Sequence, residues 1–245
     1  MPRYILLHET ASTNTYLMRM ATILPSGTVI YTNNQSAGRG QRGNSWEAEP
    51  GKNLTFSQLI KDAAVVPAEQ FYISEAVSLA IVEYLDRYTE GISIKWPNDI
   101  YFHDKKICGI LIEHTLQGNA IKNTVIGVGL NINQTEFRSD APNPVSLAQI
   151  IGKETPLEEA LHAVCELIEK YTDFKGFTAE KFAEMHKLYL SKLYRNDGDM
   201  HAFTLPDGTR IGARITDVLP DGTLCLTHSD GTAGRYAFKE IAFII

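Results

Sequence analysis

Strand-like and helix-like hydrophobic patterns follow one another along most of the chain. Runs rich in β-branched and aromatic residues predict strands, which we place at residues 3–8, 28–32, 54–60, 92–95, 100–102, 107–113 and 125–133. Apolar positions three or four residues apart predict helices, here over residues 16–24, 69–88, 155–171 and 179–193. We expect residues 103–106 to form the turn between the strands at 100–102 and 107–113. Pro156 is expected at the first position of the helix over 155–171.

The pattern changes near Arg195. From Asn196 onward, short β-runs are separated by Asp-Gly pairs, which lie at residues 197–198, 207–208, 221–222 and 230–231. Asp-Gly is a turn dipeptide, and its recurrence about every ten residues is typical of a small antiparallel barrel. We therefore predict two domains, at residues 1–195 and 196–245.

Composition and net charge narrow the function classes. The 245 residues include 23 Lys and Arg against 29 Asp and Glu, a formal net charge of −6, and 44% are hydrophobic. This hydrophobic share is that of a folded globular protein, and the acidic balance disfavours a nucleic-acid-binding protein. No apolar run approaches the roughly 18 residues of a membrane span, and no signal peptide is visible. We expect a soluble cytoplasmic protein whose cysteines are reduced thiols, namely Cys108, Cys165 and Cys225.

A glycine- and arginine-rich segment, Gly38-Arg39-Gly40-Gln41-Arg42-Gly43, follows one of the predicted strands. It has the GxGxxG spacing of dinucleotide-binding proteins, but its continuation through Trp46 and Pro50 predicts a loop where that motif requires a helix. Asn44 stands where a phosphate-binding Walker A motif requires Lys. Backbone N–H groups of glycines and arginine side chains bind anions. The segment is therefore either an anion-binding loop or a solvated turn.

A second group of polar residues lies at predicted strand ends, in Lys95-Trp96-Pro97-Asn98-Asp99 and at Lys106. A hairpin between the two strands would bring Lys106 close to Lys95 and Asp99. A lysine and an aspartate in one place suit a phosphate and a magnesium-bound water, although a surface ion pair across the hairpin would give the same pattern. The glycines of Gly127-Val128-Gly129-Leu130-Asn131 would leave room for a ligand beside them.

The histidines and serines indicate no second chemistry. His8, His114, His162 and His186 show neither an HExxH spacing nor a pair, so we predict no metal site formed by protein ligands. The sequence has no GxSxG motif, and covalent catalysis by a serine nucleophile is not expected.

Taken in order, these segments resemble biotin protein ligases. The resemblance rests on Ser12-Thr13-Asn14, on residues 35–43 with Trp46, on residues 95–99 with Lys106 and Gly109, and on residues 127–133. It covers essentially the whole chain, because the Asp-Gly-rich end is similar to the small C-terminal barrel of that family. It implies an α+β fold, in which a mixed sheet is flanked by helices as in class II aminoacyl-tRNA synthetases, with a C-terminal SH3-like β-barrel.

The resemblance also implies an ATP-dependent reaction in two steps. The biotin carboxylate attacks the α-phosphate of ATP, which forms biotinyl-5′-adenylate and releases pyrophosphate. A lysine of a biotin carboxyl carrier protein then attacks the mixed anhydride, and AMP leaves. ATP with Mg²⁺, biotin and the carrier protein are the implied ligands and partners, and a homodimer is a family expectation.

By the same resemblance, individual residues receive expected roles. Lys106 would lie between the biotin carboxylate and the α-phosphate, Arg39 would join it as a catalytic residue, and Asp99 would lie near magnesium or the attacking lysine. The biotin pocket would be formed by Ser12, Thr13, Gln35, Gly38, Arg39, Gly109 and Lys106. The nucleotide would be surrounded by Arg42, Trp46, Asn98, Asn131 and Asn133. The glycine- and arginine-rich loop would order over the adenylate and exclude water.

The chain departs from the family pattern in places. Some bacterial members carry an N-terminal DNA-binding domain and repress transcription, but Arg3 already begins the expected catalytic domain, so we expect no DNA binding. Gln41 stands where some members have an arginine whose replacement loosens retention of the adenylate. Lys239 stands where a glycine is expected before Glu240.

Two other functions remain open at this point. A lipoate protein ligase shares the fold and the adenylation chemistry, although the Arg-Gly loop and the terminal barrel favour biotin. A non-catalytic nucleotide-binding or RNA-binding module would use Arg39 and Arg42 on phosphates, and it would bind without turnover and with a steep salt dependence.

Overall fold

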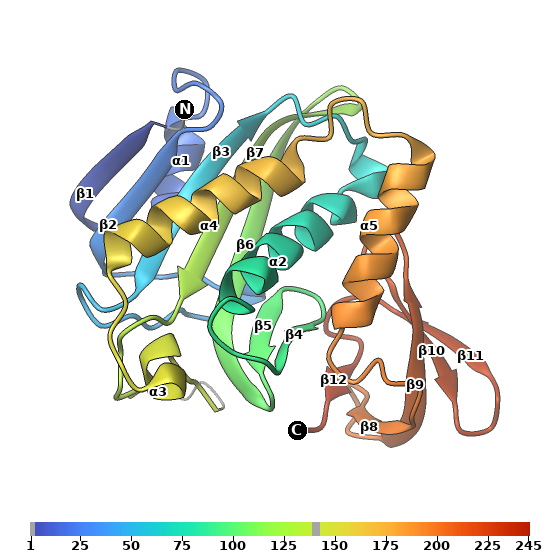
Figure 1. Cartoon of the computed structure of the whole chain (residues 1–245). Coiled ribbons are helices and arrows are strands. Elements are labelled where there is room, and N and C mark those ends of the chain that lie inside the picture. The colour runs from blue at the N-terminus through green and yellow to red at the C-terminus, as the bar shows by residue number, and fades with distance from the viewer. Residues whose placement is uncertain (1–2, 139–142) are drawn as a thin grey trace.

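A seven-stranded mixed sheet forms the centre of the molecule (Figure 1). The computed structural model describes residues 3–138 and 143–245. The strand order is β1-β2-β3-β7-β6-β5-β4, and β1 pairs with β2 in parallel whereas the other neighbours are antiparallel. The strands are β1 (Tyr4–Thr10), β2 (Val29–Gln35), β3 (Leu54–Lys61), β4 (Ile92–Lys95), β5 (Asp99–Phe102), β6 (Lys105–Gln117) and β7 (Ala120–Leu130).

Helices cover both faces of this sheet. Helices α2 (Phe71–Leu85) and α4 (Leu157–Thr172) lie across one face, α5 (Ala179–Lys192) packs beside α2, and α1 (Thr13–Met20) lies behind the sheet (Figure 1). Successive side chains of a strand point to opposite faces, so Val29 joins the core under α2 and α4 whereas Ile30 joins the core under α1. The predicted mixed sheet flanked by helices is confirmed.

The elements differ from the sequence prediction mainly at their ends. The predicted helix over 69–88 is α2, and a separate 3₁₀ turn at Pro67–Glu69 precedes it. The last two residues of the predicted turn over 103–106 belong to β6. Pro156 is the N-cap of α4 and not its first helical residue. A short helix, α3 (Leu147–Ile151), was not predicted, although Ser146 and Gln149 form the capping box that marks its start.

The last fifty residues form a second, five-stranded antiparallel sheet in the order β11-β10-β9-β8-β12. Its strands are β8 (His201–Thr204), β9 (Arg210–Val218), β10 (Leu224–His228), β11 (Ala233–Tyr236) and β12 (Ala242–Phe243). The predicted Asp-Gly turns are present, and in each the aspartate accepts a hydrogen bond from the backbone N–H two residues further on. The expected C-terminal β structure is therefore confirmed.

The two sheets share one hydrophobic core. Phe203, Leu224 and Ile241 of the terminal sheet belong to the same buried cluster as Phe71 and Tyr189 of the helices. At this boundary, Trp96 Nε1 donates a hydrogen bond to the carbonyl of Gly222 at 2.9 Å. The division into domains at residue 195 stays a prediction.

Two further expectations concern cysteines and membranes. Cys108, Cys165 and Cys225 are free thiols, as predicted. Within the described ranges, no helix combines the length and the hydrophobicity that crossing a membrane requires.

Candidate active site

A cavity of about 440 Å³ lies where the main sheet, the loop over residues 36–46 and the terminal sheet meet. Its lining includes nine of the site residues predicted from the sequence, which are Ser12, Thr13, Gln35, Arg39, Trp46, Asn98, Asp99, Lys106 and Gly109. Gly38, Asn131 and Asn133 do not line it, and the side chain of Arg42 lies outside the described part of the chain. Residues far apart in sequence thus converge on one cavity.

Lys106 and Asp99 form an ion pair at the wall of the cavity. Lys106 Nζ lies 2.7 Å from Asp99 Oδ1, and both side chains are largely covered, with 25% and 18% of their surface exposed. The register between β5 and β6 is irregular: Cys108 pairs with Ile100, but Lys106 pairs with Tyr101, which leaves Ile107 as an extra residue. Such a bulge re-aims the side chain beside it. The predicted approach of Lys106 to Asp99 is confirmed.

The indole ring of Trp46 covers two glycines on the cavity floor. A Cβ added to Gly109 would lie 2.9 Å from the ring, and one added to Gly129 would overlap it. Lys106 Nζ lies 5.6 Å from the centre of the same ring, within the range of a cation–π contact. The sequence predicts room for a ligand beside Gly127 and Gly129, and both glycines line the cavity, although side chains of the protein also lie close to them. Trp46 lies over Gly129, and Asn14 lies against Gly127.

Lys95 extends the positive charge of the cavity toward the terminal sheet. Its Nζ lies 5.1 Å from the ring centre of Tyr101 and 5.3 Å from that of Phe243 in β12. Burial of its ammonium lowers the pKa of Lys95 from its usual value, while the nearby Asp99 carboxylate acts in the opposite direction. Arg39, Lys106 and Lys95 therefore give this cavity a cationic lining suited to anionic ligands.

The predicted biotin residues at the start of α1 are joined by hydrogen bonds. The backbone N–H of Thr13 donates to Gln35 Oε1 at 2.9 Å, and the Thr13 and Ser57 hydroxyls are 2.7 Å apart. Ser12 is the N-cap of α1, and its side chain accepts a hydrogen bond from the N–H of Thr15. These uncharged donors and acceptors lie beside β3, whereas Lys95 ends β4, and β7, β6 and β5 lie between those two strands.

The glycine- and arginine-rich loop is held to the rest of the molecule at several points. Its base is fixed by backbone hydrogen bonds from Ser36 and Ala37 to the carbonyls of Thr10 and Ala11. Further along, Arg39 holds it, with Nη2 donating to Glu113 Oε2 of β6 at 2.8 Å. Residues 41–43 form a 3₁₀ turn and not the start of a helix, in agreement with the sequence argument against a dinucleotide-binding fold.

The three asparagines predicted to surround the nucleotide bond mainly to backbone. Asn98 Nδ2 donates to the carbonyl of Ile110 at 2.6 Å at the cavity wall. Asn131 Nδ2 donates to the carbonyl of Val145, and its buried Oδ1 has no partner among the described residues. Asn133 forms two hydrogen bonds with the backbone of Thr155. A nucleotide-binding role for Asn131 and Asn133 stays a prediction.

The sequence analysis missed Asn14, which lines the cavity, and Glu113, which binds the lining residue Arg39. Asn14 was quoted but given no role, and Glu113 was treated only as the end of a strand. Asn14 is 3% exposed, and its Nδ2 donates both to Leu111 O at 3.0 Å and to Glu113 Oε2 at 2.9 Å. An acidic residue at the end of an apolar strand run is the one signal that the sequence offers for Glu113. Among residues 3–138 and 143–245, no group of three or more His, Cys, Asp or Glu side chains is placed to hold a metal ion.

Comparison with known proteins gives a consistent result. Residues 6–131 match the Biotin/lipoate A/B protein ligase family. The chain is 27% identical over 238 residues to the bifunctional ligase/repressor BirA of Bacillus subtilis. The alignment covers 94% of this chain and 68% of that protein. It is 28% identical to the biotin–[acetyl-CoA-carboxylase] ligase of Paracoccus denitrificans, over 94% of this chain and 95% of that one. A biotin protein ligase from Aquifex aeolicus, solved in complex with biotin and ATP, superimposes with a TM-score of 0.77 at 26% identity, covering 99% and 98% of the two chains.

Proposed function

Because the chain belongs to the biotin/lipoate A/B protein ligase family, we propose that its cavity binds biotin and ATP and that the protein is a biotin ligase. It activates biotin as biotinyl-5′-adenylate and transfers the biotin to a lysine of a biotin carboxyl carrier protein. The observation that carries this function is the pairing of Lys106 with Asp99 in a cavity that Trp46 and Arg39 also line. The Paracoccus relative, named for acetyl-CoA carboxylase, supports a carrier protein of that kind as the acceptor.

We assign Lys106 to the reacting atoms of the first step. The biotin carboxylate and the α-phosphate of ATP are both anions, so charge repulsion opposes their approach. An ammonium between them cancels this repulsion and stabilises the negative charge that grows on the phosphate. Asp99, 2.7 Å away, holds the ammonium in place before the substrates arrive. The step needs positioning and charge cancellation but no protein nucleophile.

The two ends of the cavity fit the two substrates. The uncharged hydrogen-bonding groups of Ser12, Thr13 and Gln35 suit the ureido group and ring system of biotin. The cationic end, with Lys95 and Lys106, suits the phosphates of ATP. Trp46 lies over the glycine floor with Lys106 beside it, where its ring would stack on a flat part of either ligand. With the two substrates bound in this way, the carboxylate and the α-phosphate would meet beside Lys106.

Magnesium would enter with ATP, bound to the phosphates. Mg²⁺ prefers carboxylate and phosphate oxygens and keeps several waters. Asp99 presents a carboxylate to the cavity beside Lys106, so it would face the ion through water and exchange part of its contact with Lys106 for it. When bound, the ion would neutralise the phosphates and favour departure of pyrophosphate.

The second step requires the acceptor lysine to reach the adenylate. The amine attacks the carbonyl carbon of the mixed anhydride, AMP leaves with the electron pair, and the proton of the amine is lost to solvent or to the phosphate. Lys106 again stabilises the phosphate that leaves. We place the reaction in the cytoplasm, where the three free thiols would stay reduced. Homodimerisation stays a family expectation.

Exchange of labelled pyrophosphate into ATP, without any acceptor protein, tests the function. We expect exchange that depends on biotin and not on lipoate, because adenylation is reversible while pyrophosphate is present. Exchange with lipoate alone would assign the protein to the lipoate branch of the same family. No exchange with either acid, from a folded protein that binds ATP, would instead favour a non-catalytic nucleotide-binding module.

A further inference from the structure

Glu113 occupies a position that the proposed reaction does not explain. It lies on β6, four residues beyond Gly109, and its side chain is 31% exposed. A carboxylate beside a cavity for two anionic substrates weakens their binding unless its charge is compensated. Arg39 compensates it, with Nη2 2.8 Å from Glu113 Oε2. The same oxygen accepts a second hydrogen bond, at 2.9 Å, from Asn14.

The Asn14 contact fixes Glu113 from the interior of the protein. Asn14 is 3% exposed, and its Oδ1 accepts a hydrogen bond from the hydroxyl of Ser57, a residue with no exposed surface, at 2.5 Å. The Asn14 amide packs so closely against Gly127 that a Cβ added there would overlap it, which leaves the amide little freedom to turn. The carboxylate that meets Arg39 is therefore anchored to the core. An exposed ion pair between two mobile side chains would contribute little, but here one partner is held before the pair forms.

The network also joins the loop to the expected biotin pocket. Ser57 bonds to Thr13, and the N–H of Thr13 donates to Gln35. A continuous set of hydrogen bonds thus runs from Gln35 through Thr13, Ser57, Asn14 and Glu113 to Arg39. Its members come from β2, α1, β3, β6 and the loop. Arg39 is its last member and lies on the loop that covers the cavity.

We infer that Glu113, held by Asn14, is a positioning residue that keeps Arg39 and its loop over the cavity, and so sets how long the adenylate is retained. The inference rests on the proposed function. Glu113 acts through Arg39 and touches no reacting atom, so it affects retention of the intermediate more than its formation.

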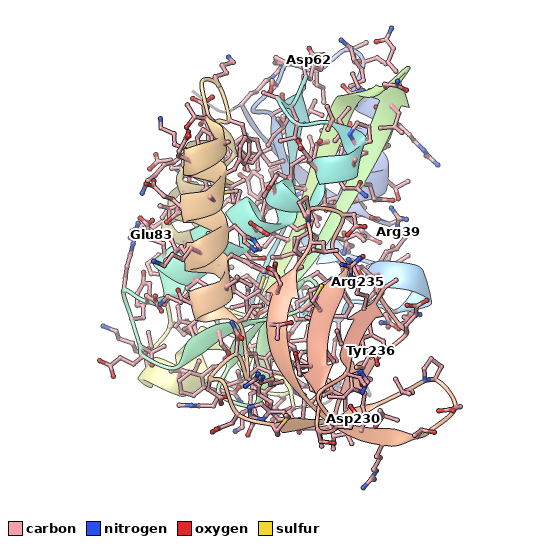
Figure 2. All side chains as sticks on the ribbon, turned by 90° about the vertical axis from the view of Figure 1, so that its right-hand side faces the viewer. Arg39, Asp62, Glu83, Asp230, Arg235 and Tyr236 are labelled. Atoms are coloured by element: carbon pink, nitrogen blue, oxygen red, sulfur yellow. The ribbon has the colours of Figure 1, made fainter. Side chains whose placement is uncertain are left out.

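The test compares Glu113→Gln with Asp62→Asn. Gln keeps the shape of the side chain but removes its charge. Asp62→Asn removes the charge from an exposed ion pair of similar length, 2.9 Å to Lys122. Figure 2 shows Asp62 at the far end of the main sheet from Arg39. Each enzyme is incubated with biotin and with ATP labelled in its α-phosphate, and unbound ligand is then removed. Release of the labelled adenylate is followed over time. Pyrophosphate exchange, measured separately, gives the rate of adenylate formation.

We expect Glu113→Gln to release the adenylate faster by on the order of tenfold, the scale of one charge-assisted hydrogen bond, while kcat for exchange changes less than about twofold. Asp62→Asn should match the wild type in both. In an Arg39→Met background, adding Glu113→Gln should change release no further, because the contact through which it acts is already gone.

Unchanged or slower release by Glu113→Gln would overturn the inference, and so would additive effects of the two substitutions. If Glu113→Gln unfolds, Arg39→Met alone, which leaves Glu113 bound to Asn14, must show the faster release. A wild-type protein without biotin-dependent exchange would refute the proposed function instead, so the two failures are distinct.

Discussion

The ammonium of Lys106 and the carboxylate of Asp99 meet at 2.7 Å, where a bulge in β6 turns the lysine toward the start of β5. Asp99 and Lys106 lie only seven positions apart in one hairpin, so their contact can form before distant parts of the chain are in place. The remaining cavity lining comes from segments as far apart as Ser12 and Phe243. Local geometry thus fixes the reacting charge, and long-range packing builds the pocket around it.

Replacement of Lys106 by alanine should slow adenylation by about a hundredfold or more, the effect of losing one preorganised charge at a developing anion. Single-turnover formation of labelled adenylate measures this directly. Lys122→Ala, which breaks the exposed pair with Asp62, is the matched control and should leave the rate unchanged. A loss of less than tenfold for Lys106→Ala would contradict the role assigned to the ammonium.

Replacement of Gly129 by alanine should displace Trp46, because the new methyl group would overlap the indole ring. We expect KM for ATP to rise by about tenfold, given that overpacking of this kind costs roughly 1–3 kcal/mol. Tryptophan fluorescence should change as well. Gly212→Ala serves as the control, since the nearest atom to its added Cβ is 4.0 Å away. Unaltered fluorescence and KM would show that the absence of a side chain at residue 129 is not required for the position of Trp46.

Replacement of Trp96 by phenylalanine should lower the midpoint of thermal unfolding by about 2–4 °C, since a hydrogen bond of about 1 kcal/mol to the Gly222 carbonyl is lost in the core. Differential scanning calorimetry would measure it. Trp46→Phe removes the same volume from an indole whose Nε1 has no partner among the described residues, so its effect should be smaller. Equal shifts would argue against a role for the bond between the sheets.

The free energy of unfolding should fall as the pH rises through about 9. His186 on α5 lies 2.8 Å from Glu75 on α2 and 2.8 Å from Asp217 on β9. The hydrogen bond with Glu75, opposed by burial and helped by the charges of Glu75 and Asp217, raises the pKa of His186 to about 9. A histidine in an unfolded chain has a pKa of about 6.5. The folded state therefore binds the extra proton, and this stabilisation is complete below pH of about 6.5 and lost as the pH passes about 9.

Urea unfolding at a series of pH values between 6 and 10 measures this dependence. Burial raises the pKa of Glu75, while the contact with His186 lowers it, so the two groups titrate as a pair. His186→Gln should flatten the profile between about pH 6.5 and 9. A wild-type profile that does not fall in this range, or a variant profile that falls as steeply, would refute the assignment.

The sequence predicted well those features that depend on neighbours along the chain. The apolar stripe of α2, the turns at Asp-Gly pairs and the hairpin that joins Lys106 to Asp99 are all local. It missed features that depend on pairing over long distances. Glu75 and His186 are 111 residues apart in sequence, and Asn14 and Glu113 are 99 residues apart, so no spacing rule relates them. The five-residue helix α3 was too short for periodicity to show.

The candidate site shows the same division. The motifs singled out the candidate site residues, and the cavity brings most of them together. The position of Trp46 over Gly109 and Gly129 could not be predicted. A glycine in the sequence indicates that another group packs closely against the backbone there, but it does not identify that group. Glu113 was missed for a related reason, since its partners Arg39 and Asn14 are defined only by the folded sheet.

The terminal sheet shares its core with the helices and contributes Leu205, Phe238 and Phe243 to the cavity wall. During synthesis the chain is made from its N-terminus, so the strand that carries Phe243 leaves the ribosome after every other part of the cavity. A nascent chain that has been made as far as α5 already contains Lys106 and the glycine- and arginine-rich loop. It still lacks the terminal sheet, whose buried side chains pack in one cluster with Phe71 and Tyr189 in the finished protein. The cavity would therefore be complete only after the terminal sheet has been made, and until then those aromatic side chains would lack part of their cover.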